Sequence, residues 1–152
     1  MELNFDTAAM EGYHSAAQAA RVLTEKWVTD NMFCPRCGRT HISRFPNNRP
    51  VADFYCPDCG NEYELKSKGG ALGHKVVDGA YGTMIKRMIG QETPDFFFMS
   101  YSKKSLRVTD FLLIPKHFFV PGVIEKRKPL AATARRAGWV GCNILLDQIP
   151  EQ

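Results

Sequence analysis

The sequence predicts an α/β protein in which helices flank a mixed central sheet. Periodic apolar residues predict helices over 14–30 and 78–89, and two nearly continuous apolar runs, 95–101 (DFFFMSY) and 110–114 (DFLLI), are typical of buried central strands. The order helix, hairpin, helix, strand, strand fits an α/β sandwich around such a sheet. A chain of 152 residues is long enough for one domain with a proper core, so we expect residues 1–152 to form a single domain.

The first predicted helix carries both capping and packing signals. Ser15 and Gln18 have the spacing of a capping box at its start. Four apolar residues recur at helical spacing and should pack against the sheet: Ala16, Ala20, Leu23 and Trp27. Glu25 lies off this stripe. A carboxylate at that place can serve as an extra metal ligand, but we expect Glu25 to be solvated, as most glutamates are.

Residues 50–66 (PVADFYCPDCGNEYELK) predict two short strands joined by a tight connection. The first carries Asp53, and the second carries Glu64 and Lys66, which project from one face because side chains two apart on a strand point the same way. If the strands pair, Asp53 lies beside Glu64. Adjacent carboxylates repel unless a cation lies between them, and hard oxygen ligands suit Mg²⁺. Lys66 can orient or deprotonate a water, or stabilise charge on a phosphate.

This combination of residue types predicts metal-assisted hydrolysis of a phosphodiester. The alternative is a surface hairpin whose charged side chains are simply solvated.

Two CPxC motifs predict a structural zinc site inserted into the fold. Cys34 and Cys37 are separated by eighteen residues from Cys56 and Cys59, which is the spacing of two zinc knuckles. Zinc would connect the turn of the hairpin to the segment before it, over residues 34–59. Four cysteine ligands leave no position for a reacting water, so zinc is not expected to be the reaction metal. The alternative is a set of buried free thiols or a disulfide pair.

The loop around residues 46–50 and the segments after the hairpin add further expectations. Arg44 and Arg49 can each contact phosphate or lie at the surface. Asp78 is expected to cap the second helix. A closing strand is expected over residues 142–146, where Cys142 should be a small buried hydrophobe.

Residues 129–138 predict a short third helix, which begins at a proline and ends at a glycine. Its last turn carries Arg135 and Arg136, and Trp139 follows directly. Arginines beside an aromatic ring at a helix end can grip phosphates and can stack on bases or wedge between them. The alternative is a helix end whose dipole the arginines compensate, next to a tryptophan in the core.

The composition indicates a folded globule in a reducing compartment. Seventeen aromatic residues and an apolar fraction of 44% support a packed core. Five cysteines, four of them at metal-ligand spacing, argue against a secreted disulfide scaffold. The sequence has no run of eighteen apolar residues and no basic-then-apolar leader, so we expect a cytoplasmic protein that does not contact membranes. The net charge of +4 is modest, but basic clusters can follow phosphates.

Pro50, Asp53 and, after ten further residues, Glu64-Leu65-Lys66 resemble the PD-(D/E)xK nuclease motif. With the knuckles and the C-terminal segment added, the chain resembles the catalytic domain of the DpnI-type methyl-directed restriction endonucleases. The matching stretches are ARVLTEKWV, the two CPxC knuckles, NNRPVADFYC, YELKSK, DGAYGTMIKR, FFFMSYSKK and KPLAATARRAGWVGCNI.

The resemblance implies a PD-(D/E)xK fold with Asp53, Glu64 and Lys66 as the active site and with a Cys₄ zinc. It also implies cleavage of both DNA strands at GATC sites that carry N6-methyladenine. Members of the family continue into a C-terminal winged-helix domain, which is absent from these 152 residues. DNA recognition would then rest on this domain, with Arg135, Arg136 and Trp139 as candidates.

We therefore expect a Mg²⁺-dependent type II endonuclease that is monomeric in solution and binds double-stranded, adenine-methylated DNA. Three alternatives stay open. The first is a zinc-ribbon module that reads methylated DNA or other nucleic acid without cleaving it. The second is a thiol redox protein that uses the CxxC motifs, and the third is a repair or nicking nuclease on the same fold.

Overall fold

The chain folds into two compact units in a computed structural model that describes residues 1–46 and 52–150. Unit 1 contains residues 1–71 and 94–114, and unit 2 contains residues 72–93 and 115–152. The single domain expected for the whole chain stays a prediction. Arg49, and the start of the predicted hairpin at Pro50 and Val51, lie outside the described residues.

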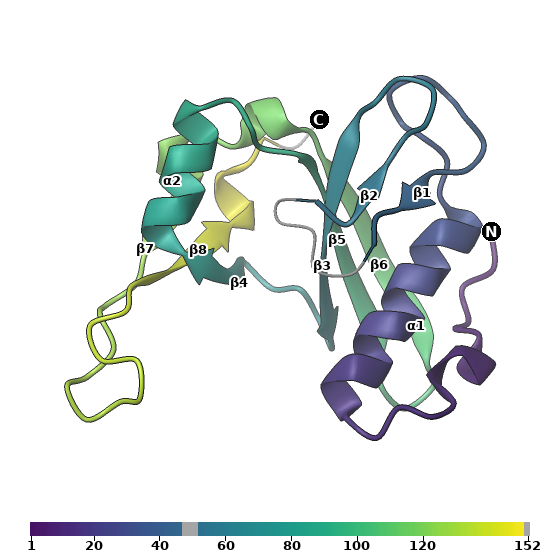
Figure 1. The fold of residues 1–152 in the computed structure, drawn as a ribbon, viewed down its shortest axis with the longest axis horizontal. Coiled ribbons are helices and arrows are strands. Elements are labelled where there is room, and N and C mark those ends of the chain that lie inside the picture. Colours follow the sequence, from purple (N-terminus) through teal and green to yellow (C-terminus); the bar gives the residue numbers. More distant parts are fainter. Residues whose placement is uncertain (47–51, 151–152) are drawn as a thin grey trace. The chain divides into compact units, whose positions relative to one another are not determined.

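Unit 1 is built on a five-stranded sheet with the strand order β1-β2-β3-β5-β6 (Figure 1). The strands are β1 Ser43–Arg44, β2 Phe54–Tyr55, β3 Glu62–Gly69, β5 Asp95–Ser102 and β6 Arg107–Ile114. β3 and β5 run parallel, whereas the other neighbouring pairs run antiparallel. The predicted mixed sheet is therefore confirmed.

The two apolar runs of the sequence have different places in this sheet. β5 lies between β3 and β6, and Phe96, Phe97 and Phe98 are fully buried, which confirms a central strand. β6 is the last strand of the order, and Leu112 is 44% exposed. The prediction of a second buried central strand is wrong: apart from a bridge between Arg107 and Asn4 at its start, β6 is the edge strand of the sheet, and an antiparallel edge strand can leave apolar side chains open to solvent.

Helix α1 (Ala16–Asn31) covers one face of the unit 1 sheet, close to the predicted range of 14–30 (Figure 1). Ser15 is its N-cap residue, but the Ser15 side chain makes no capping hydrogen bond, so the predicted capping box is not formed. Leu23 and Trp27 are buried as predicted, whereas Ala16 is exposed. The buried stripe therefore begins later along the helix than expected.

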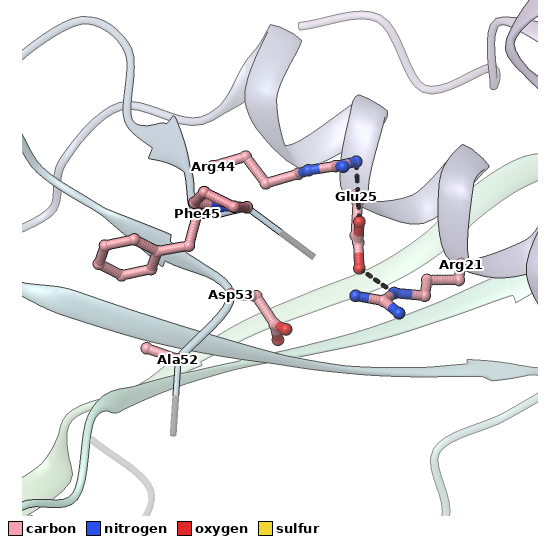
Figure 2. Close-up of a pocket in the computed structure, with 7 residues that line it drawn as sticks. Arg21, Glu25, Arg44, Phe45, Ala52 and Asp53 are labelled. Atoms are coloured by element: carbon pink, nitrogen blue, oxygen red, sulfur yellow. Dashed lines mark hydrogen bonds and ion pairs between the residues drawn. The ribbon is translucent and has the colours of Figure 1, made fainter. Parts of the chain in front are cut away.

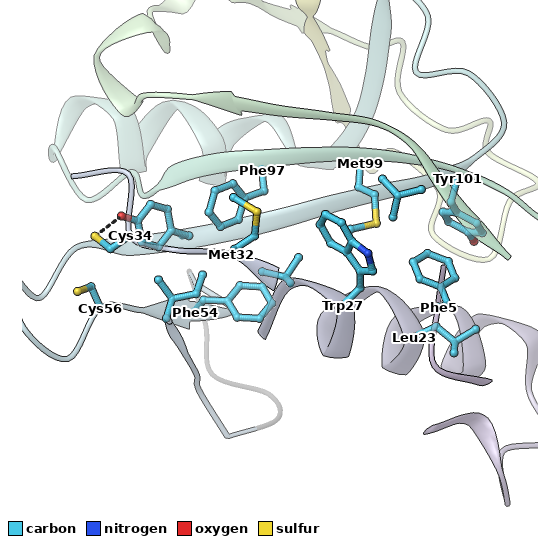
Figure 3. Close-up of a cluster of buried hydrophobic side chains, with 14 residues drawn as sticks. Phe5, Leu23, Trp27, Met32, Cys34, Phe54, Cys56, Phe97, Met99 and Tyr101 are labelled. Carbon is cyan, nitrogen blue, oxygen red and sulfur yellow. Dashed lines mark hydrogen bonds between the residues drawn. The ribbon is translucent and has the colours of Figure 1, made fainter. Parts of the chain in front are cut away.

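The core of unit 1 lies between α1 and the sheet. Figure 3 shows Leu23 and Trp27 of the helix facing Phe97, Met99 and Tyr101 of β5. The indole Nε1 of Trp27 donates a hydrogen bond to the carbonyl of Glu2 at 2.7 Å, so the buried ring has its polar group satisfied. Alternate residues of β5 thus fix one face of the sheet against α1.

Unit 2 is built on a three-stranded antiparallel sheet with the order β4-β8-β7. Its elements are β4 Lys75–Ala80, α2 Tyr81–Ile89, β7 Ile124–Lys126 and β8 Gly141–Leu145. Asp78 lies within β4, and Ala80 is the N-cap of α2, so the predicted Asp78 cap is wrong. β8 confirms the closing strand to within one residue, and Cys142 is fully buried as predicted.

Four short 3₁₀ helices complete the described elements: Thr7–Met10, Lys116–Phe118, Pro121–Val123 and Leu146–Gln148. Among the described residues, no helix is both long enough and apolar enough to span a membrane.

The predicted third helix over residues 129–138 is not formed. This segment is a loop of successive turns, closed where Gly138 N donates to Leu130 O (3.0 Å) and Leu130 N donates to Trp139 O (2.9 Å). Gly138 has a φ of +78°, which ends the turns in the left-handed region. A helix of about ten residues is marginal in water without a packed face, and this segment is mostly exposed.

Candidate active site and metal centre

Two similar turns build the cysteine cluster of unit 1. In the first turn Gly38 N donates to Cys34 O at 2.8 Å, and in the second Gly60 N donates to Cys56 O at 2.9 Å. Both glycines have a positive φ, +81° and +71°, so a side chain at either place would be strained. The glycine after each CPxC motif thus allows the chain to turn back beside its own cysteines.

The four thiols of the motifs converge on one point. All four Sγ atoms lie within 4.8 Å of one another, and Cys34–Cys59 and Cys37–Cys56 are each 3.6 Å apart. Sulfur atoms of a tetrahedral zinc site are about 3.8 Å apart, given Zn–S bonds of about 2.3 Å. All five cysteines of the chain are free thiols, so the disulfide alternative is wrong. The cluster can hold one metal ion such as zinc.

Neighbouring side chains support the cluster. Tyr63 Oη lies 3.1 Å from Cys34 Sγ. Burial opposes ionisation of Cys34, but hydrogen bonds from Tyr63 and from the backbone of its own turn lower the pKa of Cys34, whereas burial and contacts with neighbouring thiols raise the pKa values of Cys37 and Cys59. A thiolate is the form that binds a metal. Arg39 and Asp58 form an ion pair between the two turns.

The predicted hairpin is formed by β2 and β3, which pair with Phe54 opposite Tyr63. Asp53 directly precedes β2, and its backbone N donates to Tyr63 O at 2.9 Å. Its Oδ2 accepts a hydrogen bond from Leu65 N at 2.8 Å. These two bonds fall on either side of Glu64. The paired strands therefore bring Asp53 beside Glu64, as the sequence predicts.

Glu64 and Lys66 form the other half of this arrangement. Lys66 Nζ lies 2.6 Å from Glu64 Oε1, and the two side chains are 21% and 15% exposed. Leu65, between them in sequence, packs against the core below α1. Because side chains alternate along a strand, Glu64 and Lys66 project from the opposite face of the sheet, and Asp53 lies at the edge of β3 where β2 ends.

Glu25 is not solvated, and that prediction is wrong. Glu25 is 5% exposed and lies between two arginines. Arg21 Nε is 2.6 Å from Glu25 Oε1, and Arg44 Nη1 is 2.9 Å from Glu25 Oε2 (Figure 2). The cause is a tertiary contact, because Arg44 comes from β1 and a carboxylate can be buried when guanidinium groups pair with both oxygens.

The electrostatics of Asp53 fit a cation. Burial raises the pKa of Asp53, and the charges of Glu64 and Glu25 raise it further, whereas the Leu65 N–H and the Lys66 ammonium act in the opposite direction. A half-buried carboxylate that other carboxylates destabilise gains most from a divalent cation. The oxygen donors of Asp53 and Glu64 are the hard ligands that Mg²⁺ prefers.

Two cavities meet at Asp53. One has a volume of about 110 Å³ and the other about 300 Å³, and Arg21, Glu25 and Asp53 line both. Figure 2 shows the residues of the smaller one. The larger cavity also borders Ala17, Ala20, Thr24, Leu65, Ser67 and Tyr101. Solvent and a ligand of that size can therefore reach the Asp53 carboxylate from the α1 side.

A family model described as DpnI, Dam-replacing family, matches residues 1–152, which is the whole chain. The chain belongs to this family. Membership confirms the resemblance to the DpnI-type restriction endonucleases and supports a nuclease that acts on DNA.

The match to the Dam-replacing family spans both units, so it includes the predicted DNA-contact residues of unit 2. Arg136 stacks on Trp139, with 4.4 Å from its Cζ to the ring centroid. Arg135 is exposed in the same loop, and Trp139 is partly buried. The three residues lie in a loop and not at a helix end, and their role stays a prediction.

Arg21 is the residue of the site that sequence reasoning missed. One signal for it exists, because Arg21 and Glu25 are four positions apart on a predicted helix, where opposite charges can pair. That spacing gives no indication of burial, since such pairs are usually at the surface.

Proposed function

We propose that this chain is a Mg²⁺-dependent type II restriction endonuclease that cleaves double-stranded DNA at GATC sites containing N6-methyladenine. The observation that carries the proposal is the bracketing of Glu64 by the two hydrogen bonds of Asp53, with Lys66 beside it. Membership of the Dam-replacing family supports the nuclease activity. The sequence and methylation specificity rest on the family resemblance alone.

Asp53 and Glu64 would hold the divalent cation. When bound, such a cation neutralises charge on the scissile phosphate and lowers the pKa of a water molecule. The Leu65 N–H donates to one oxygen of Asp53 and so holds the carboxylate in one orientation before a cation binds. The fixed carboxylate thus supplies a preformed oxygen ligand at the edge of the sheet.

Lys66 would act on the reacting phosphate. Its ion pair with Glu64 places the ammonium next to the proposed metal ligands. From there Lys66 can orient the attacking water and stabilise the negative charge that develops on the phosphate oxygens.

The four cysteines would hold a structural zinc ion. Cys56 and Cys59 belong to the connection between β2 and β3, and Cys34 and Cys37 belong to the segment after α1. A metal ion at this place would tie the turn of the catalytic hairpin to the rest of unit 1.

DNA recognition would involve the loop of unit 2. Arg135 and Arg136 would contact backbone phosphates, and Trp139 would lie near the base. A methyl group on N6 adds apolar surface in the major groove, so an aromatic neighbour would favour methylated adenine. The stacking of Arg136 on Trp139 would limit the rotamers of both side chains before DNA binds. The enzyme would act in the cytoplasm as a monomeric catalytic domain.

A plasmid digest with Mg²⁺ tests the proposal. Matched plasmid DNA from an adenine-methylating host and from a non-methylating host is incubated with the wild-type chain and with Asp53→Ala. We expect discrete fragments from methylated DNA alone and none with the variant. Cleavage of both DNAs would contradict the methyl specificity. Methyl-dependent binding without cleavage would instead favour a reader module, and single-strand cuts would favour a nicking nuclease.

A further inference from the structure

We infer that Arg21 binds a backbone phosphate of DNA beside the reacting centre, and that Glu25 is the positioning residue for Arg21. This inference rests on the proposed function, because it assigns a phosphate subsite to the same site. It concerns a side of Asp53 that the predicted set of Asp53, Glu64 and Lys66 does not include.

The Glu25 carboxylate is buried. A charged carboxylate that is only 5% exposed is costly unless both oxygens have partners. Glu25 meets this condition with Arg21 on one oxygen and Arg44 on the other. Glu25 thus holds Arg21 from the helix, while Arg44 holds Glu25 from β1, and the carboxylate cannot turn away from either.

Arg21 is the exposed member of its ion pair with Glu25. Its side chain is 49% exposed, although its partner is buried. Within the part of the chain that the structure describes, its ion pair uses Nε. The end of the guanidinium formed by the two terminal nitrogens is a different edge from the one that uses Nε, and Figure 2 shows the guanidinium on the Asp53 side of Glu25. A guanidinium binds phosphate through such a pair of parallel N–H groups.

The two cavities beside Asp53 give Arg21 space for a ligand. Arg21 lines both cavities that meet at Asp53, and the larger one, about 300 Å³, has small side chains along α1 at Ala17 and Ala20. Small residues leave room for a sugar-phosphate chain to approach the helix. A phosphate bound by Arg21 would therefore lie on the α1 side of Asp53, the proposed cation ligand that lines both cavities.

The charged side chains described around Asp53 balance one another in number. Among the described residues around Asp53, three carboxylates (Asp53, Glu64 and Glu25) accompany three cationic groups (Arg21, Arg44 and Lys66). One bound divalent cation would give these six described groups a net charge of +2, which favours the binding of anionic phosphodiesters. Of these three cationic groups, Arg21 has the most exposed side chain, at 49% against 36% for Arg44 and 21% for Lys66, so it is the best placed to contact a phosphate beside the reacting one.

The salt dependence of DNA binding tests the inference. Fluorescence anisotropy with a methylated GATC duplex is measured from 50 to 200 mM NaCl, with Ca²⁺ in place of Mg²⁺, for the wild type and three variants. The slope of log K against log salt is negative, and we expect Arg21→Gln to reduce its magnitude by about 0.9, which is the value for one lost phosphate contact. Affinity should fall about tenfold to a hundredfold, as for the loss of a charged hydrogen bond.

Lys26→Gln is the matched control on the same helix. It removes the same charge, but Lys26 is paired with Asp30 and lines neither cavity, so the slope should stay at the wild-type value. An equal loss of slope in Arg21→Gln and Lys26→Gln would overturn the inference, since it would reflect net charge alone. An unchanged slope in Arg21→Gln would overturn it as well.

Glu25→Gln tests the positioning role by the sign of its effect. Removing a negative charge near DNA should by itself tighten binding. If Glu25 positions Arg21, binding instead weakens and the slope falls, while the melting temperature shows that the variant is folded. Tighter binding would overturn the role. A wild-type chain that binds with an Arg21-dependent slope but does not cut DNA would refute the proposed function and leave the phosphate subsite standing.

Discussion

Replacing Asp53 separates two opposing effects of this side chain on stability. The carboxylate accepts a hydrogen bond from Leu65 N at 2.8 Å, which stabilises the hairpin. Its charge is destabilising, because burial and the charges of Glu64 and Glu25 raise the pKa of Asp53 above its usual value. Asp53→Asn retains an acceptor for Leu65 N and removes the charge. We therefore expect Asp53→Asn to melt above the wild type in Mg²⁺-free buffer that retains zinc.

Asp53→Ala removes the acceptor as well as the charge. A backbone N–H left without a partner costs about 1–3 kcal/mol, so Asp53→Ala should melt about 2–12 °C below Asp53→Asn for a chain of this size. Addition of Mg²⁺ at about one hundred times its Kd should stabilise the wild type by about 2.7 kcal/mol, and neither variant by a comparable amount. Both variants should have lost DNA cleavage.

Differential scanning calorimetry of the three proteins, with and without Mg²⁺, measures these differences. Asp30→Asn is the matched control, because Asp30 is half exposed on α1 and forms a surface pair with Lys26. The Asp30→Asn substitution should change the free energy of unfolding by no more than about 0.5 kcal/mol, so the melting temperature should stay close to the wild-type value. A melting temperature of Asp53→Asn below that of the wild type in Mg²⁺-free buffer would refute the reasoning, as would an equal Mg²⁺ shift in all three proteins.

Three further outcomes are expected. The purified chain should contain one zinc ion, and Cys56→Ser should prevent folding, because structural zinc contributes about 10–16 kcal/mol, as much as the whole stability of a typical domain; a folded variant without metal would contradict this. Lys66→Ala should lower the cleavage rate by at least about 10²-fold with DNA affinity within twofold (about 0.4 kcal/mol), and equal losses in both would assign Lys66 to binding. Trp139→Ala should lose the preference for methylated DNA in competition binding, and a retained preference would remove Trp139 from recognition.

The hairpin and the cysteine cluster could be predicted because their signals are local. Side-chain alternation places Glu64 and Lys66 on one face whatever the rest of the chain does. The CPxC spacing fixes where each pair of thiols can point, and the following glycine supplies the left-handed turn. In both motifs, the interactions that decide the structure lie within a few residues of sequence.

The predictions that proved wrong concern structure that interactions with distant parts of the chain decide. Glu25 is buried because Arg44, nineteen positions later in the sequence, reaches it from another element, and no periodicity on the helix records such a partner. Residues 129–138 have helix-forming alanines and a correct start and end, yet the segment has no packed face to stabilise a helix. Asp78 has the composition of a cap, but its pairing with Cys142 draws it into β4.

The shortness of β2 connects the cysteine cluster to the proposed active site. β2 contains two residues, so its ladder ends before Leu65, and the Leu65 N–H is left for the Asp53 carboxylate. At the other end of the same strand, three residues after Asp53, Cys56 enters the metal cluster. A slip of one residue between β2 and β3 would exchange the faces of Leu65 and Glu64.

Such a slip would bury the Glu64 carboxylate below α1, where Leu65 now packs, and would separate it from Lys66. The metal cluster resists this change, because moving β3 by one residue would also move Cys59 away from Cys34. A structural metal that takes no part in the reaction would therefore set the register in which Asp53 and Glu64 meet. Loss of zinc should accordingly reduce cleavage even under conditions in which part of the fold survives.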